Sequence, residues 1–205
     1  IQKSWERIED ELLRSIILRE IFREAEKDLQ YEFLISFEFE KKFWRDWESE
    51  GQLIRAHSYR MLGRRDEAYK FYQISHALAV KLSDVRERSL YHQVLIELEV
   101  EEYVRAKKHL EQLLSSYPES RFRPEYHFWY ALVLHEKNED PIRSLMALRQ
   151  IEENVERGDD SLFLQGRIHL EQSNWNQASR VFRRLKSNFQ KLWKIYIFKE
   201  NQFLK

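Results

Sequence analysis

Small side chains recur along this chain at nearly constant intervals, and each is followed by larger apolar residues. The intervals are 38, 38 and 34 residues, and a large apolar residue follows each small one by four positions. Residues four and seven positions apart share one face of a helix, so the same helical face is apolar in every copy. Intervals of this length accommodate two helices and their turn, which predicts a series of helical hairpins. The small residues are Ala68, Ala106, Ser144 and Ala178, and the large ones are Tyr72, Leu110, Leu148 and Phe182.

The composition agrees with a helical chain. Among 205 residues there are only four Gly and three Pro, while charged residues make up 34% and apolar residues 42%. This content of turn formers is too low for a many-stranded β fold, and the apolar content is too high for a disordered chain. We therefore expect an all-α protein.

The repeating unit resembles the tetratricopeptide repeat (TPR), a family unit of about 34 residues in two antiparallel helices. The second copy departs from the family pattern with Val94, and the third departs with Ser144 and Pro141. The resemblance covers about residues 50 to 190 and implies a right-handed α-solenoid of TPR-like helix hairpins. Its residues are Ala56, Tyr59, Gly63, Ala68 and Tyr72 in the first clear copy, and Gly166, Trp175, Ala178 and Phe182 in the last.

The repeat pattern is not legible before Gly51. We expect residues 1–50 to form an N-terminal helical cap or a divergent repeat, because a solenoid must cover its terminal apolar face. Residues 51–205 should hold about four TPR-like repeats and a C-terminal helix, all in one continuous domain. The chain begins with Ile rather than Met, which leaves open whether a signal peptide or further domains lie outside it.

No motif for catalysis or metal binding occurs in the sequence. It has no HExxH, no glycine-rich phosphate loop, no GxSxG, no SxxK and no cysteine. His127 and His135 are eight residues apart, whereas helical metal ligands are normally three or four apart, so we interpret them as surface histidines. The segment that holds Glu97, Glu99, Glu101 and Glu102 is interpreted as a solvated helical face rather than as paired catalytic carboxylates. We expect a non-enzymatic protein without metal or cofactor.

The charge balance bears on the class of partner. Thirty-five basic residues balance thirty-five acidic ones, so no overall field attracts nucleic acid or anionic lipid. No run approaches the roughly 20 apolar residues that a membrane span needs. We therefore expect a protein or peptide partner, with no nucleic acid and no direct membrane insertion of this chain.

The first helix of each stacked hairpin lines the concave side of a solenoid, which places a set of candidate binding residues there. Aromatic residues at equivalent positions, flanked by arginines, would suit an extended or helical peptide with apolar anchors and an acidic group. The alternative is that these rings fill the seams between repeats. The candidates are Tyr91, Trp129, Phe163, His57, Arg60 and Arg167.

These patterns favour a scaffold or adaptor that binds a partner in its concave groove. The alternatives are a regulatory or oligomerisation module of a larger protein and, least favoured, an enzyme built on a helical solenoid. The segment "SSYPESRFRPEYHFWYALVL" resembles repeats of bacterial envelope-assembly and cell-division proteins, which favours the bacterial periplasm, with the cytoplasm as the alternative. The sequence does not indicate the partner's identity or the oligomeric state.

Overall fold

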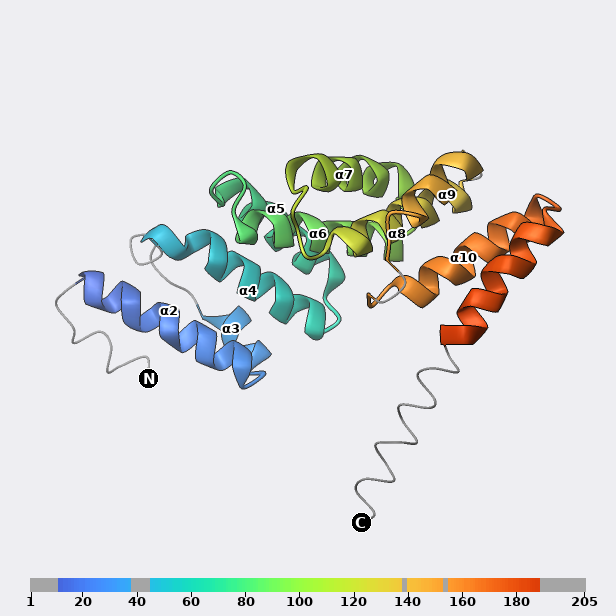
Figure 1. The fold of residues 1–205 in the computed structure, drawn as a ribbon. Helices are drawn as coiled ribbons and strands as arrows, with labels where there is room; N and C mark the ends of the chain where they lie inside the picture. Colours follow the sequence, from blue (N-terminus) through green and yellow to red (C-terminus); the bar gives the residue numbers. More distant parts are fainter. Residues whose placement is uncertain (1–10, 38–44, 138–139, 153–154, 189–205) are drawn as a thin grey trace, which may run out of the picture. The chain divides into compact units, whose positions relative to one another are not determined.

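The structure is a computed structural model that describes residues 11–37, 45–137, 140–152 and 155–188 (Figure 1). Within these ranges the regular structure is helical and contains no strand, which confirms the expected all-α fold. The chain forms two compact units, residues 1–109 and 110–205, which are described separately. The division into an N-terminal cap and one repeat domain stays a prediction.

The first unit is a succession of helices in which each one packs against the next. Helix α2 contacts α3 and α4, α3 contacts α4, α4 contacts α5, and α5 contacts α6. One short 3-10 helix, η2, leads into α4. The bounds are α2 Glu11–Lys27, α3 Tyr31–Ser36, η2 Arg45–Trp47, α4 Glu48–Met61, α5 Arg65–Leu78 and α6 Asp84–Glu99, followed by α7 Tyr103–Ser116, which crosses into the second unit.

Large side chains form the core between α2, α3 and α4. Phe22 and Leu34 are fully buried, and the Phe22 ring meets the Trp47 ring edge-on at 5.5 Å between centroids. The indole Nε1 of Trp47 donates a hydrogen bond of 3.1 Å to Ser15 Oγ, so its polar atom is satisfied inside the core. Apolar burial of this kind stabilises the N-terminal helices against α4.

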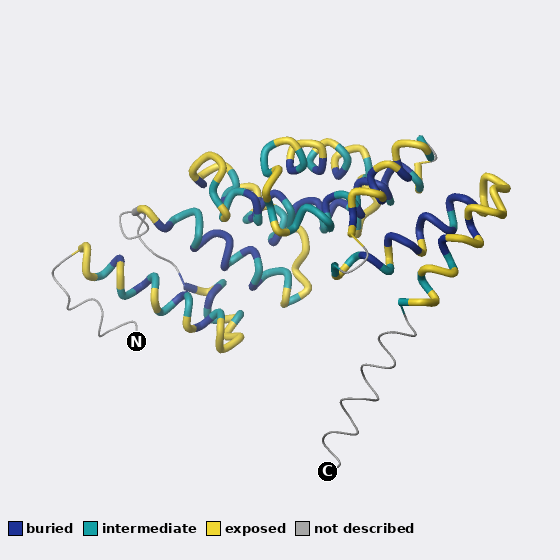
Figure 2. Tube along the Cα trace, viewed as in Figure 1, coloured by how far each residue is buried: buried dark blue, intermediate teal, exposed yellow. Residues whose placement is uncertain are grey.

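The small residues that define the repeat are buried where helices pair. Ala68 and Ala106 are 0% exposed, Ser144 is 0% exposed and Ala178 is 1% exposed. In the first unit Ala68 belongs to one apolar cluster with Tyr72, which is also fully buried. A small side chain at these points allows the two helices to approach closely, as the sequence pattern predicts. Figure 2 shows buried residues recurring along one side of the helices, with exposed residues on the other.

The second unit contains the end of α7 and the helices that follow it. Helix α8 contacts α9 and α10, and α9 contacts α10. Pro141 is the first residue of α9, where its missing N–H is tolerated, and Asp140 Oδ1 accepts a hydrogen bond of 2.9 Å from the Arg143 backbone N–H. The helices are α8 Arg123–Glu136, α9 Pro141–Leu148, α10 Gly158–Glu171 and a further helical stretch over 175–188.

One turn geometry recurs between the two helices of a hairpin. It spans three residues, and its middle residue has a positive φ angle: 57° at Leu29, 74° at Gly63, 60° at Glu101 and 58° at Ser173. In each turn the next backbone N–H donates a 2.8 Å hydrogen bond to a carbonyl five residues earlier, which closes the end of the first helix. These four turns therefore share one length, whereas four residues separate α8 from α9, and the connections between hairpins, at 79–83, 117–122 and 149–157, differ in length.

Candidate functional site

The six predicted partner-binding residues are divided between the two units. His57, Arg60 and Tyr91 lie in the first unit, and Trp129, Phe163 and Arg167 lie in the second. An aromatic ladder that runs through both units therefore stays a prediction.

Counting back from the C-terminal end of each helix changes the predicted ladder position in α8 by one residue. Tyr91 and Phe163 each lie nine residues before the residue that caps the C-terminus of their helix, Val100 and Gln172 respectively. In α8 the capping residue is Lys137, so the residue nine positions earlier is Phe128 rather than Trp129. Counted in this way, Phe128 takes the position equivalent to Tyr91 and Phe163. Phe128 is 9% exposed, so most of its ring is packed inside the unit.

His57 and Arg60 on α4 both have partners within the first unit. His57 Nε2 lies 2.8 Å from His92 Nε2, and its Nδ1 lies 3.3 Å from Glu26 Oε1. Two imidazoles in this contact need one donor and one acceptor, so at least one of the two rings is neutral. Burial, reinforced by the neighbouring His57, lowers the pKa of His92 to about 3. Arg60 forms an ion pair with Glu99.

The aromatic residues Tyr91 and Trp129 are half-buried. The Arg157 guanidinium lies 5.1 Å from the centroid of the Trp129 ring and 5.2 Å from that of Phe128, and the two rings meet edge-on at 5.2 Å. Arginine over an aromatic face is an attractive cation–π arrangement. Trp129 thus has a packing role within its own unit, which fits the interpretation of rings that fill seams.

Phe163 and Arg167 differ from the other candidates because they lie on the exposed face of α10. Phe163 is 52% exposed and Leu170 is 38% exposed, and positions 163, 167 and 170 share one face of the helix. Arg167 lies between the two apolar residues, with an Nη2 atom 3.3 Å from His135 Nε2 and 3.7 Å from a Glu171 carboxylate oxygen. An apolar and basic stripe on a first helix of a hairpin is available to a partner.

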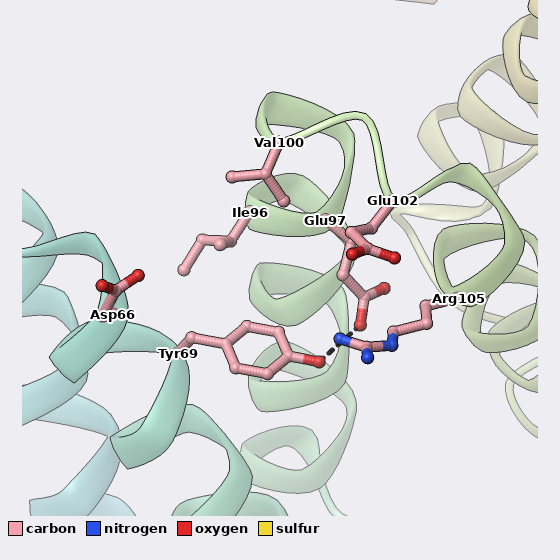
Figure 3. Close-up of a pocket in the computed structure, with 7 residues that line it drawn as sticks. All are labelled: Asp66, Tyr69, Ile96, Glu97, Val100, Glu102 and Arg105. Atoms are coloured by element: carbon pink, nitrogen blue, oxygen red, sulfur yellow. Dashed lines mark hydrogen bonds between the residues drawn. The ribbon is translucent and has the colours of Figure 1, made fainter.

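A cavity of about 250 Å³ lies between α5, α6 and the start of α7 (Figure 3). At its base is Glu97, which is only 2% exposed. The Tyr69 hydroxyl donates a 2.7 Å hydrogen bond to Glu97 Oε1, and His109 Nδ1 lies 3.0 Å from Glu97 Oε2. Burial, followed by the hydrogen bond to Glu97, raises the pKa of Tyr69 to about 12, so the hydroxyl keeps its proton and remains a donor. The buried carboxylate is therefore satisfied by the protein itself.

The sequence interpretation of this acidic segment was wrong at one position. Glu99, Glu101 and Glu102 are exposed as expected, but Glu97 is buried. Its partners come from other helices, 28 residues earlier and 12 residues later in the chain, so no local pattern marks it. The one available signal is that Glu97 lies between apolar Ile96 and Leu98 near the end of α6.

Two segments of the chain, 88–120 and 160–191, match the sequence model of the tetratricopeptide repeat family. The two matched segments are tetratricopeptide repeats. The matched segments hold the second and fourth copies of the hairpin, with Ala106 and Ala178 as their small residues. No curated protein matches the chain at a significant level.

Solved TPR-like structures share the fold of the chain. BtubC (BKLC) from P. vanneervenii is 14% identical, aligns over 88% of this chain and 80% of its own, and has a TM-score of 0.65. MamA from Desulfovibrio magneticus RS-1 is 12% identical over 86% and 96% of the two chains, with a TM-score of 0.66. TPR-like repeats of kinesin light chain type from Podosopora anserina are 13% identical over 90% and 99%, with a TM-score of 0.63. At these identities the similarity establishes the TPR fold.

TPR folds generally mediate protein–protein interactions through the surfaces of their stacked hairpins. Within the described ranges, no group of three or more His, Asp or Glu side chains is arranged to hold a metal ion. In that same part of the chain no helix is both long and apolar enough to cross a membrane.

Proposed function

We propose that the chain is a non-enzymatic scaffold that binds a protein partner, and that the exposed stripe of α10 is part of the contact surface. The observation that carries this proposal is the exposure of Phe163 (52%) and Leu170 (38%) on either side of Arg167. Burying an exposed aromatic ring and a leucine against a partner gains about 25 cal/mol for each Å² of apolar surface removed from water.

The chemistry of the stripe indicates the kind of segment that it fits. Phe163 and Leu170 would contact apolar side chains that recur on one face of a helix or extended peptide. Arg167 would contact an acidic group, because a guanidinium forms paired hydrogen bonds with a carboxylate. Tyr91, His57 and Arg60 in the first unit, and Trp129 on α8 in the second, are proposed as further partner-binding residues, each within its own unit.

A photo-crosslinking experiment tests this surface. Phe163 is replaced by a photoreactive phenylalanine analogue, and the protein is irradiated in lysate of the organism that produces it. Arg180 is an exposed residue of the last hairpin and serves as the matched control position. We expect a discrete crosslinked protein from position 163 and none from position 180, and this product should disappear with Arg167→Glu.

The mass of the product separates the candidate functions. A product with the mass of this chain plus another protein supports the scaffold. A product of twice the mass of the chain would instead indicate an oligomerisation module. Equal labelling at positions 163 and 180, or none at either, would contradict a partner site on α10.

A further inference from the structure

A second cavity, of about 260 Å³, lies within the second unit between the end of α9, α10 and helix 175–188. Its lining is basic and polar: it includes Arg149, Arg184, His169, Gln165 and Gln177, and among the described residues that line it there is no Asp or Glu. Basic side chains without a carboxylate in this described lining favour an anion over a cation.

His169 at this cavity is a buried polar group without a partner. It is 8% exposed, and its Nδ1 atom makes no hydrogen bond with the described part of the chain. A buried nitrogen that lacks a partner destabilises the protein, and this cost is recovered when a ligand supplies the hydrogen bond. The side chain of Arg149 likewise has no hydrogen bond or ion pair among the described residues.

The second hairpin holds Glu97 at the position equivalent to His169. Glu97 lies 72 residues before His169, and both lie three residues before the C-terminal cap of their helix. Glu97 is satisfied by His109, whereas the residue 72 positions after His109 is the apolar Val181. The fourth hairpin therefore holds a basic group where the second holds an acidic one, and it has lost the internal partner.

We propose that this cavity binds an oxyanion, the phosphate or carboxylate group of a ligand, between Arg149, Arg184 and His169. Guanidinium groups form charge-assisted, paired hydrogen bonds with both kinds of oxyanion, and an imidazole N–H adds a third donor. The Gln177 amide at the same wall supplies a neutral donor. The α10 residues at the cavity, Gln165 and His169, lie on the opposite face of the helix from Phe163 and Leu170, so the site is separate from the α10 stripe of the proposed partner surface.

The test is a titration of the full chain with inorganic phosphate and, in parallel, with glutarate, followed by the NMR signals of the His169 ring. Burial, together with the nearby Arg149 charge, lowers the pKa of His169. A bound anion favours the protonated imidazole, so we expect the pKa of His169 to rise with one of the two probes. The probe that binds more tightly identifies the oxyanion, phosphate or carboxylate.

Two variants and a control make the result specific to the cavity. Arg149→Gln should weaken binding about tenfold, the effect of losing one charge-assisted hydrogen bond. His169→Glu places at this position the carboxylate that Glu97 provides in the second hairpin, and it should abolish anion binding. Arg180→Gln removes the same charge from an exposed position of the same unit outside the cavity and should leave affinity within about twofold.

Three results would overturn the proposal. They are no saturable binding of either probe, an equal loss of affinity in Arg149→Gln and Arg180→Gln, or full binding by a folded His169→Glu protein. Circular dichroism establishes folding for each variant. The crosslinking at position 163 should be unaffected by Arg149→Gln, which separates failure at this cavity from failure at the partner surface.

Discussion

Gly166 provides the sharpest test of close packing in the last hairpin. A Cβ atom built at this position would lie 2.4 Å, 2.5 Å and 2.9 Å from three carbons at the far end of the Phe182 ring. Carbon atoms in ordinary contact are about 3.5–4.0 Å apart, so Gly166→Ala requires the ring to move by about 1 Å. The ring also meets the Phe163 ring edge-on, at 6.4 Å between centroids.

Two opposing effects decide the sign of Gly166→Ala. Replacing glycine by alanine within a helix gains about 1 kcal/mol, because alanine loses less conformational entropy. Overpacking costs about 1–3 kcal/mol. We therefore expect a net loss of about 1 kcal/mol in the free energy of unfolding.

A double-mutant cycle separates the two effects. Leucine at position 182 lacks the ring carbons that would clash, so in a Phe182→Leu background the helix-propensity gain should remain alone. Gly166→Ala should then stabilise the protein by about 1 kcal/mol, which gives a coupling of about 2 kcal/mol. The measurement is urea unfolding followed by far-ultraviolet circular dichroism, with unchanged m values as the check that the variants unfold comparably.

The sign reversal is the decisive result. If Gly166→Ala has the same effect in both backgrounds, the Phe182 ring is not what requires a glycine. If it stabilises the protein with Phe182 in place, the packing described here is too loose to hold the two helices at this distance.

Three further predictions follow from the first unit. Glu101→Gly should stabilise the protein by about 0.5–1 kcal/mol in urea unfolding because the turn requires a positive φ, and Gly63→Ala should destabilise it by about as much. Tyr69→Phe removes a donor from buried Glu97 and should cost about 1–3 kcal/mol in the same assay, whereas an unchanged midpoint would mean that water replaces the hydroxyl. The pKa of His92 is lowered in the folded state, so the stability due to its neutral form is present above about pH 6.5 and is lost as the pH falls towards 3, by at most about 1.4 kcal/mol per pH unit. Unfolding measured between pH 7 and pH 4 should show a shallower loss in His92→Asn.

The repeat was predictable because its constraint is local in sequence. Ala68, Ser144 and Ala178 had to be small wherever two helices approach, and that requirement leaves a periodic trace. The N-terminal helices leave no such trace, because large residues occupy the corresponding positions. Phe22 lies 34 residues before Ala56, and Leu34 lies 34 residues before Ala68; both are fully buried. There the core is filled by side chains rather than by close approach of the helices.

The parts that could not be predicted depend on residues distant in the chain or on backbone geometry. Glu101 and Ser173 adopt a conformation that glycine usually marks, because the hydrogen bonds of the turn hold them there. The binding candidates were reached by counting, and the register in α8 moves from Trp129 to Phe128 because four residues rather than three separate α8 from the next helix. Glu97 was interpreted as a surface group, and its burial is evident only once the helices that cover it are placed.

The shared three-residue turns and the variable connections between hairpins differ in how well they can accept added residues. An insertion within a three-residue turn would break the hydrogen bond that closes a helix and would misalign the two halves of a hairpin. The connection at 79–83 already differs in length from its counterparts and exposes Val80 and Leu82 at 78% and 61%. It is therefore the natural place to graft an epitope or fluorescent label while the interaction surfaces stay intact.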